Sequence, residues 1–345
     1  MNEPEETGEE LSQNFYELTP DRVLDSAQEL GFNVTGHCQA LNSLENRVFD
    51  VLLDDRTAIV MKFYRPHRWS KEQLQEEHDF LYELVEDELP VIAPLKIDKA
   101  SVFKNEEIYF SIWPRIGGRE PEELTPEQLT SLGSLLARMH LVGERKPFEH
   151  RQALNPVNFI TSPLELIKPM LPDIISDRYL ESAQQVAEKF TDLSVKYPVH
   201  RIHGDCHKGN LLLVNDGFLF LDFDDSMSGP AVQDFWMLAS TGDEQTAINL
   251  QLLAEGYSRF KDFDNGQLAM VEVLRAVRFI HYSGWIARRW NDKSFHNVFP
   301  HFATDKYWID ETNDLEKQIE KFSEPRIIDD SPGLSNSDYF FDWEG

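Results

Sequence analysis

Three side chains in the second half of the chain carry the oxygen atoms that phosphoryl transfer requires. Asp205 is followed five residues later by Asn210, and Asp222 comes after two short apolar segments, residues 211–214 and 218–221. In such reactions one carboxylate receives the proton of the acceptor hydroxyl, while an amide oxygen and a second carboxylate hold Mg²⁺ on the nucleotide phosphates. The types and the order of these residues therefore predict a Mg²⁺-dependent phosphotransferase site.

The two apolar segments flank the turn formers of residues 215–217, which predicts a β-hairpin. If Val214 faces Phe218 across a three-residue turn, the register carries outward until Asn210 lies opposite Asp222. Opposed side chains of antiparallel strands are about 5 Å apart. We therefore expect this pair to hold one metal ion together at the open end of the hairpin.

The residues from His203 to Asn210, followed by Leu221-Asp222, resemble the catalytic loop and the metal-binding Asp of the aminoglycoside phosphotransferase and choline kinase group of protein-kinase-like enzymes. Further segments, spread in order over roughly residues 15–322, resemble the bacterial stress response kinases of the RdoA type, which are Ser/Thr protein kinases on this fold. These segments are residues 42–48, 60–66, 76–78, 203–210 and 229–234. The resemblance implies an α+β, bilobal protein-kinase-like fold with a small antiparallel-sheet lobe and a mostly helical large lobe.

Lys62 and Glu77 are candidates for a pair that supports the nucleotide. Lys62 is the one cation in the strand expected over residues 57–64, and the resemblance implies that it contacts nucleotide phosphates. A lysine in mid-strand is otherwise more often a solvated side chain. Glu77 falls on the apolar stripe of a helix, between Leu74 and Leu81, and an inward Glu is costly unless it meets a cation. Lys62 is its natural partner; the alternative is a salt bridge unrelated to nucleotide.

No glycine-rich G-x-G-x-x-G loop occurs in this sequence, and a polar loop of residues 42–46 stands in its place. A Ser in such a turn commonly bonds its own backbone, whereas the resemblance implies that Ser43 contacts an ATP phosphate. The expected site therefore has three groups of residues. Asp205 and Asp222 are catalytic, Asn210 and Asp222 hold the metal, and Ser43, Lys62 and Glu77 serve the ATP.

Composition bounds the partners and the location. Acidic residues number 61 and basic residues 33, for a net charge of −28. Such a surface repels nucleic acid and anionic membranes, so we expect neither as a partner. Cys38 and Cys206 are too few for a disulfide framework, no hydrophobic run reaches membrane-spanning length, and the acidic N-terminus lacks a signal-peptide pattern. We expect a cytoplasmic protein, and a monomer.

The expected order along the chain is a disordered acidic start (1–14), a nucleotide-binding lobe (15–114), a helical catalytic lobe (115–323) and a flexible tail (324–345). Capping boxes at Ser70 and Thr125 each predict the start of a helix. His140 is expected to be a packed structural residue. Asp234 resembles the helix Asp that holds the catalytic-loop backbone in kinases; the alternative is a carboxylate favoured by the helix dipole.

A helix expected over residues 266–290 carries an unusual group of basic and aromatic side chains. They are Arg275, Arg278, Arg288, Arg289, Trp285 and Trp290. Core aromatics with arginines that extend to solvent are the favoured interpretation. The alternative is a basic surface that engages an acidic substrate or caps the cleft.

Two other functions fit parts of the same loop. His200, His203, Asp205, Cys206 and His207 are clustered, and a His-x-Asp-x-His pattern can bind zinc. However, a hydrolytic zinc site usually needs further ligands elsewhere, and no second histidine cluster accompanies this one. The other alternative is a kinase-like fold that binds nucleotide without chemistry, but all the residues expected of a catalyst are present.

The acceptor is the feature that the sequence constrains least. Only twelve positions separate Asp222 from Asp234, too few for a long activation loop, and this shortness is typical of small-alcohol kinases. Asp224 and Asp225 would attract a cationic small substrate or supplement the metal charge. The wider resemblance implies a protein Ser/Thr acceptor, which includes the kinase itself. We therefore expect an ATP- and Mg²⁺-dependent Ser/Thr protein kinase of the bacterial stress response. The alternative is a kinase of a choline-, aminoglycoside- or homoserine-like alcohol.

Overall fold

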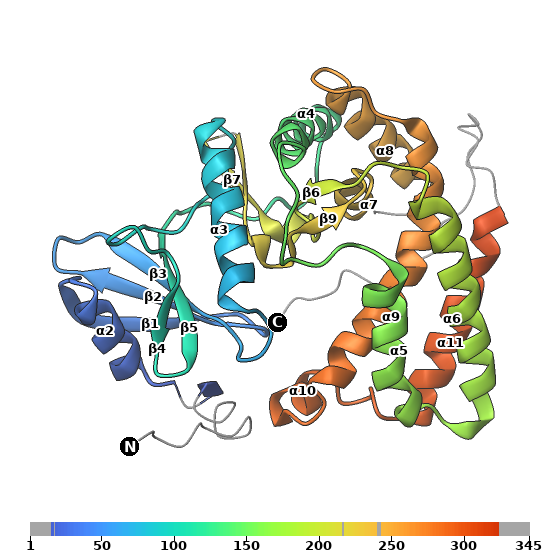
Figure 1. The fold of residues 1–345 in the computed structure, drawn as a ribbon, viewed down its shortest axis with the longest axis horizontal. Helices are drawn as coiled ribbons and strands as arrows, with labels where there is room; N and C mark the ends of the chain where they lie inside the picture. Colours follow the sequence, from blue (N-terminus) through green and yellow to red (C-terminus); the bar gives the residue numbers. More distant parts are fainter. Residues whose placement is uncertain (1–14, 17, 216, 240–242, 324–345) are drawn as a thin grey trace. The chain divides into compact units, whose positions relative to one another are not determined.

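The computed structural model describes residues 15–323, apart from residue 17, residue 216 and residues 240–242 (Figure 1). The expected disordered start and flexible tail lie outside the described residues. The chain separates into two compact units: residues up to Glu122 together with Gly209–Asp224, and Glu123–Lys208 together with the residues from Asp225 onward. Within the described ranges, none of the helices combines the length and the apolar character that a membrane crossing demands.

These two units differ from the lobes that the sequence predicts. The division falls after Glu122 rather than after Pro114, and the hairpin belongs to the first unit instead of the second. Backbone hydrogen bonds explain the difference, because Arg119 and Leu213 donate to each other at 3.3 and 2.8 Å. In addition, the Phe220 amide donates to the Pro90 carbonyl at 2.8 Å. Pairings of this kind are made only on folding and leave no local pattern in the sequence.

The first unit is built on one antiparallel sheet with the strand order β1-β2-β3-β5-β4. Its elements are α2 (Pro20–Glu29), β1 (Val34–Leu41), β2 (Arg47–Leu53), β3 (Ala58–Phe63), α3 (Lys71–Glu86), β4 (Phe103–Asn105), β5 (Ile108–Pro114), β7 (Leu211–Val214) and β8 (Gly217–Phe220). Apolar residues of α2 and of the central strands form its main core, among them Val23, Ala27, Phe49, Met61, Phe63 and Phe110.

Strand β3 places its lysine away from this core. Successive residues of a strand point to opposite faces, so Met61 and Phe63 are buried in the core while Lys62 lies on the other face. Val48 of β2 and Ser111 of β5 flank Lys62 in the ladder. The period of two residues that the sequence shows is thus what brings Lys62 to the face opposite the main core.

Helix α3 begins at the predicted capping box. The Ser70 hydroxyl accepts from the Gln73 amide at 3.3 Å, and the Gln73 side-chain oxygen accepts from the Ser70 amide at 2.9 Å. Leu74, Glu77 and Leu81 are all buried. The inward direction predicted for Glu77 from helical spacing is therefore confirmed.

The hairpin of β7 and β8 is confirmed, but its predicted register is wrong by one residue. Val214 pairs with Gly217, so two residues rather than three connect the strands. Asn215 adopts a φ of 47°, in the left-handed region that tight hairpin turns use. Carried outward, this register places Asn210 opposite Leu221, whose amide donates to the Asn210 carbonyl at 2.9 Å. Asp222 lies one position further along.

The second unit is mostly helical. Its longer elements are α4 (Pro126–Gly143), α5 (Ser162–Ile167), α6 (Asp173–Ser194), β6 (His200–Ile202), β9 (Met227–Gly229), α7 (Gln233–Ala239), α8 (Asp243–Tyr257), α9 (Val271–Arg288), α10 (Lys293–Val298) and α11 (Asp305–Glu320). The capping box predicted at Thr125 is present, with Thr125 and Gln128 bonding each other's backbone amides. Helical spacing and caps therefore locate the start of α4 correctly.

One sheet of this unit was not predicted. Strands β6 and β9 pair antiparallel, with His200 opposite Gly229 and Ile202 opposite Met227. All three residues of β6 are buried, so no alternation of polar and apolar residues marks it. A strand of three residues is too short for a periodicity argument. Strand β6 ends at Ile202 and so leads directly into the loop that contains Asp205.

Candidate active site

Lys62 is the centre of a cluster of charges in the first unit. Its ammonium group is 2.9 Å from Asp222 Oδ1 and forms a second ion pair with Asp224. Desolvation lowers the pKa of Lys62, but the negative charges of Asp222, Asp224 and Glu77 outweigh it and hold that pKa well above its usual range. Lys62 therefore keeps its positive charge. The expected attraction to Glu77 is one of three carboxylate attractions that act on it.

Asp224 is a buried member of this cluster that the sequence did not single out as structural. Its side chain is only 3% exposed and accepts from Asn46 Nδ2 at 2.6 Å. Arg68 Nη1 lies 3.4 Å from the same carboxylate. Burial acts to raise the pKa of Asp224, but Lys62, Arg68 and Asn46 together lower it to about 2. Its carboxylate therefore balances the two cations instead of facing solvent.

Asp222 differs from Asp224 in exposure and in backbone geometry. Half of its side chain (51%) is exposed, so a bound ion could reach it. Its φ of 54° lies in the left-handed region, which non-glycine residues seldom adopt and which often marks a functional position. Asp222 lies two residues beyond Phe220, where strand β8 ends. The prediction that Asn210 lies directly opposite Asp222 is therefore wrong. The two residues still lie at the same end of the hairpin, offset by one position.

Arg65 holds the polar loop that replaces the glycine-rich loop. Arg65 Nη2 donates to the Leu44 carbonyl at 3.1 Å and Arg65 Nε to the Glu45 carbonyl at 3.2 Å. The Ser43 hydroxyl accepts from the Asn46 amide at 3.2 Å, which is the local hydrogen bond that a serine commonly makes in a turn. The phosphate contact of Ser43 that the resemblance implies remains a prediction.

In the second unit, Asp234 anchors the loop that carries Asp205. The amides of His203 and Gly204 donate to the Asp234 carboxylate at 2.9 and 2.8 Å. Gln233 Nε2 donates to the Gly204 carbonyl at 2.9 Å. The role inferred for Asp234 from the resemblance, which was to hold the catalytic-loop backbone, is confirmed in its geometry.

Gly204 and His140 complete this anchor. Gly204 has a φ of 86°, and a Cβ there would lie 2.2 Å from the Asp225 carbonyl oxygen, so only glycine fits. His140 is fully buried, with Nε2 3.0 Å from Asp234 and Nδ1 3.1 Å from the Tyr257 hydroxyl. The prediction that His140 is a structural residue is therefore confirmed.

Arg278 and His207 flank the carboxylate of Asp205. Arg278 Nη1, from α9, lies 3.1 Å from Oδ1, and His207 Nε2 lies 3.4 Å from Oδ2. Desolvation acts to raise the pKa of Asp205, but the hydrogen bond with His207 and the charge of Arg278 hold it well below its usual range. Asp205 is thus ionised, which a proton acceptor requires. Arg278 was expected to extend to solvent, and no spacing rule would have paired it with Asp205 across 73 residues.

The histidine cluster does not support a zinc site. His200 is buried with its ring 4.7 Å from that of His140, and burial lowers its pKa to about 2. Among the described residues, no group of three or more His, Cys, Asp or Glu side chains is placed to hold a metal ion. An amide and a carboxylate, such as Asn210 and Asp222, instead form a donor set suited to an ion that phosphates also coordinate.

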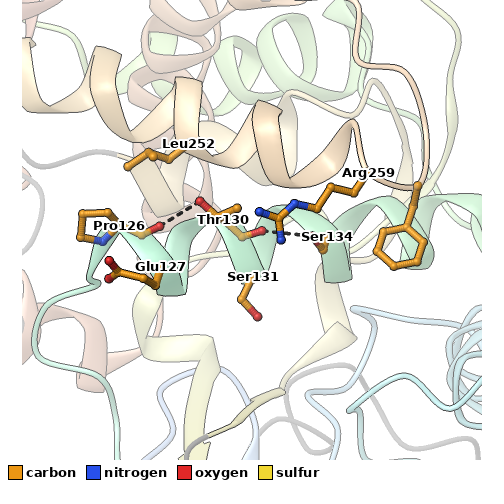
Figure 2. Close-up of a pocket in the computed structure, with 8 residues that line it drawn as sticks. Pro126, Glu127, Thr130, Ser131, Ser134, Leu252 and Arg259 are labelled. Atoms are coloured by element: carbon orange, nitrogen blue, oxygen red, sulfur yellow. Dashed lines mark hydrogen bonds between the residues drawn. The ribbon is translucent and has the colours of Figure 1, made fainter.

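A separate cavity of about 780 Å³ lies between α4 and α8 of the second unit (Figure 2). It is lined by Pro126, Glu127, Thr130, Ser131, Ser134, Leu252, Arg259 and Phe260. Figure 2 shows two of these hydroxyls turned back onto their own helix, Thr130 onto Pro126 and Ser134 onto Thr130. None of the expected site residues lines this cavity.

Solved kinases share this architecture. An amicoumacin kinase solved with AMP-PNP and Ca²⁺ aligns with a TM-score of 0.73 and 18% identity over 92% of this chain and 96% of its own. A microcompartment-associated aminopropanol kinase aligns at 0.67 and 19% identity, over 87% of this chain and 98% of its own. A choline kinase from Cryptosporidium parvum aligns at 0.58 and 14% identity, over 88% and 96%. At these identities the likeness establishes the fold alone.

The model of the phosphotransferase enzyme family matches residues 37–270. The chain therefore belongs to this family, and it is an ATP-dependent kinase. It is similar to stress response kinase A of Escherichia coli K12, with 35% identity over 91% of this chain and 96% of the relative. It is similar, at 34% identity and the same coverage, to the serine/threonine protein kinase RdoA of Salmonella typhimurium LT2.

Proposed function

We propose that this kinase transfers the γ-phosphoryl group of Mg²⁺-bound ATP to Ser or Thr hydroxyls of proteins, itself included, in the bacterial stress response. The observation that carries the proposal is the Lys62–Asp222 ion pair, which joins the strand lysine to the carboxylate that follows the hairpin. Lysine and aspartate in these two positions serve phosphate and metal in kinases. The 34–35% identity to stress response and RdoA kinases over 91% of the chain supports the protein acceptor.

Each site residue then has a defined task. Asp205 accepts the acceptor hydroxyl proton as the oxygen bonds to the γ-phosphorus, and the bond from that phosphorus to the ADP oxygen breaks. Asn210 and Asp222 would hold Mg²⁺, which when bound neutralises phosphate charge. Lys62, fixed by Glu77, would exchange its carboxylate partners for phosphate oxygens. The remaining member, Ser43, would contact a phosphate from the loop that Arg65 holds.

A small-molecule alcohol is the second candidate acceptor. The amicoumacin, aminopropanol and choline kinases all share the fold. Their names indicate acceptors much smaller than a protein. Because these similarities lie at 14–19% identity, they favour this candidate less than the stress response relatives favour a protein acceptor.

Mass spectrometry of phosphorylation sites tests the proposal. The protein is incubated with Mg²⁺-ATP alone and with a bacterial lysate, beside an Asp205→Asn variant. We expect phospho-Ser or phospho-Thr from the wild type and a loss of about 10²- to 10⁴-fold in rate from the variant, with nucleotide binding nearly retained. Transfer to choline or amino alcohols without any protein phosphorylation would support the second candidate. Unaltered turnover by the variant would reject Asp205 as the base.

The location and the oligomeric state are proposals of the same kind. Both cysteines, Cys38 and Cys206, are free thiols, and Cys206 is buried. Free thiols are compatible with a reducing compartment, so we propose the cytoplasm. A monomer would be consistent with a complete set of site residues in one chain, and light scattering of the purified protein tests it.

A further inference from the structure

Arg278 of α9 forms an ion pair with one of the two carboxylate oxygens of the proposed base, Asp205. Its guanidinium Nη1 lies 3.1 Å from Asp205 Oδ1, while His207 lies by the other oxygen. More than a third of the Arg278 side chain (37%) is exposed, and a quarter of Asp205. This pair is therefore at a surface that an acceptor can reach, unlike the buried pairs around Asp224.

Arg278 and two further arginines act on one neighbouring ring, that of His281. The His281 ring, one turn further along α9, stacks on Phe159 at 4.5 Å. Burial, followed by the positive charges of Arg278, Arg288 and Arg289, lowers the pKa of His281 to about 3. Three arginines thus act together on one ring, in a chain whose net charge is −28. Of the basic residues that the sequence showed on this helix, Arg278 contacts the proposed base.

We propose that Arg278 is a specificity-determining residue that selects Ser or Thr acceptors with an Asp or Glu close to the phosphorylated hydroxyl. The inference rests on the proposed function, since it takes Asp205 as the base. A hydroxyl that approaches Asp205 must share or displace the guanidinium. An acidic side chain of the acceptor then gives Arg278 a new charged partner, so that its positive charge is not left unpaired.

Basic acceptors face the opposite situation. A lysine or an amino alcohol beside the hydroxyl brings a second positive charge toward Arg278, and like charges at an interface disfavour the wrong partner. Selection therefore combines an attraction to acidic acceptors with a repulsion of basic ones. An alternative task for Arg278, direct contact with ATP phosphates, predicts no preference among acceptors.

Three peptides that differ only in the residues flanking one Ser, which are Glu, Ala or Lys, measure this preference. We expect kcat/KM of the wild type to be about tenfold higher for the Glu peptide than for the Lys peptide. The preference should weaken as salt is raised, because exposed charges are screened. Arg278→Gln should make the three peptides nearly equal, Arg278→Glu should reverse their order, and Arg278→Lys should restore part of the preference.

Arg275→Gln is the matched control. Arg275 lies one turn earlier on α9 and pairs with Glu272 at 3.4 Å, so its loss should leave the order of the peptides unchanged. Circular dichroism verifies that each variant folds, and the wild-type comparison stands even if a variant does not. Equal kcat/KM for the Glu and Lys peptides, with transfer that still requires Asp205, overturns the inference and leaves the proposed function intact. A change in the KM for ATP alone in Arg278→Gln also overturns it. Transfer to small alcohols only, with every peptide inert, overturns both.

Discussion

Asp224 of the first unit and Asp234 of the second are two buried carboxylates with different partners. Both are almost free of solvent, with 2% and 0% of the residue exposed. Asp224 is held by side chains, which are the cations Lys62 and Arg68 and the Asn46 amide. Asp234 is held by two backbone amides of the loop before Asp205 and by His140. Each satisfies the rule that a buried charge must be paired.

The two sets of partners suit these carboxylates to different tasks. Long cationic side chains can exchange one partner for another, so the pairs of Asp224 hold Lys62 in place but leave it able to change partners. Backbone amides cannot exchange without moving the chain, so the bonds of Asp234 fix the course of the loop before Asp205. Under the proposed function, the first carboxylate would balance charge near the nucleotide, and the second would set the geometry at the acceptor. Substitutions at the two carboxylates and at their neighbours test this distinction.

Removing Asp234 should have the largest effect. Asp234→Ala leaves two buried amides and His140 without their acceptor, so we expect a loss of about 3–5 kcal/mol in the free energy of unfolding. Asp234→Asn keeps one acceptor oxygen and should lose less. Urea unfolding measures both values. Equal losses from the two variants would contradict the view that amide acceptance is the task of this side chain.

Gly204→Ala tests the same loop from its backbone. A Cβ at this position would lie 2.2 Å from the Asp225 carbonyl at a φ of 86°, so we expect a loss of about 2–4 kcal/mol and a large drop in phosphoryl transfer. Gly36→Ala is the control, because Gly36 has a similar φ of 89° but nothing within 4 Å of the added Cβ. Its cost should be only about 1 kcal/mol, from backbone strain. Similar costs for both would show that the contact with Asp225 is immaterial.

Asp224→Asn tests the charge cluster. Lys62 and Arg68 lose one shared counterion but keep Asp222 and Glu45 nearby, so we expect a smaller loss of about 2 kcal/mol. A higher KM for ATP should accompany it if Asp224 positions Lys62. Asp222→Asn is the comparison, because that half-exposed side chain should cost less than about 1 kcal/mol while it removes activity. The opposite ranking in stability would refute the division of tasks between the two carboxylates.

The smallest predicted effect is on the pH dependence of stability, to which His281 of the second unit and Asp224 of the first contribute in different pH ranges. Burial, and then nearby arginines, lower the pKa of His281 from 6.5 to about 3. The unfolded chain therefore binds a proton below pH 6.5 that the folded chain does not, and stability falls as the pH falls. From pH 6.5 to about pH 5.5 this residue should account for a loss of about 1 kcal/mol, which His281→Gln removes.

Asp224 should not contribute to the change in stability between pH 6.5 and about pH 5.5. Its folded pKa of about 2 lies below the ordinary value of 3.8, so its stabilisation is present above 3.8 and is lost as the pH falls toward 2. Calorimetric or urea measurements on Asp224→Asn should therefore differ in slope from the wild type only below about pH 4. A change in slope near pH 6 in this variant would contradict the assignment of that acid response to His281.

Local patterns predicted much of the fold and part of the site. Helical spacing turned Glu77 inward, and capping boxes located the starts of α3 and α4. The hairpin was found, but its register was wrong because one turn residue more or fewer shifts every pair by one. Residue types indicate the position of a turn more reliably than the number of residues that it contains.

Pairings between distant segments were not predicted. Strand β6 meets β9 and Arg278 meets Asp205 only through tertiary packing. Asp224 was identified only by its charge, because its burial depends on Asn46 and Arg68, which lie more than 150 residues away. No local period encodes such contacts.

Residue types and their spacing were enough to identify the family, the order of the chemical groups and the inward faces of individual helices, because these depend on local features of the chain. Which charges meet was set by the fold. It assigned Lys62 to Asp222 and Asp224, the loop amides to Asp234, and Asp205 to Arg278. The physical reason is that the strength of a charge pair depends on distance and burial, and folding alone sets both.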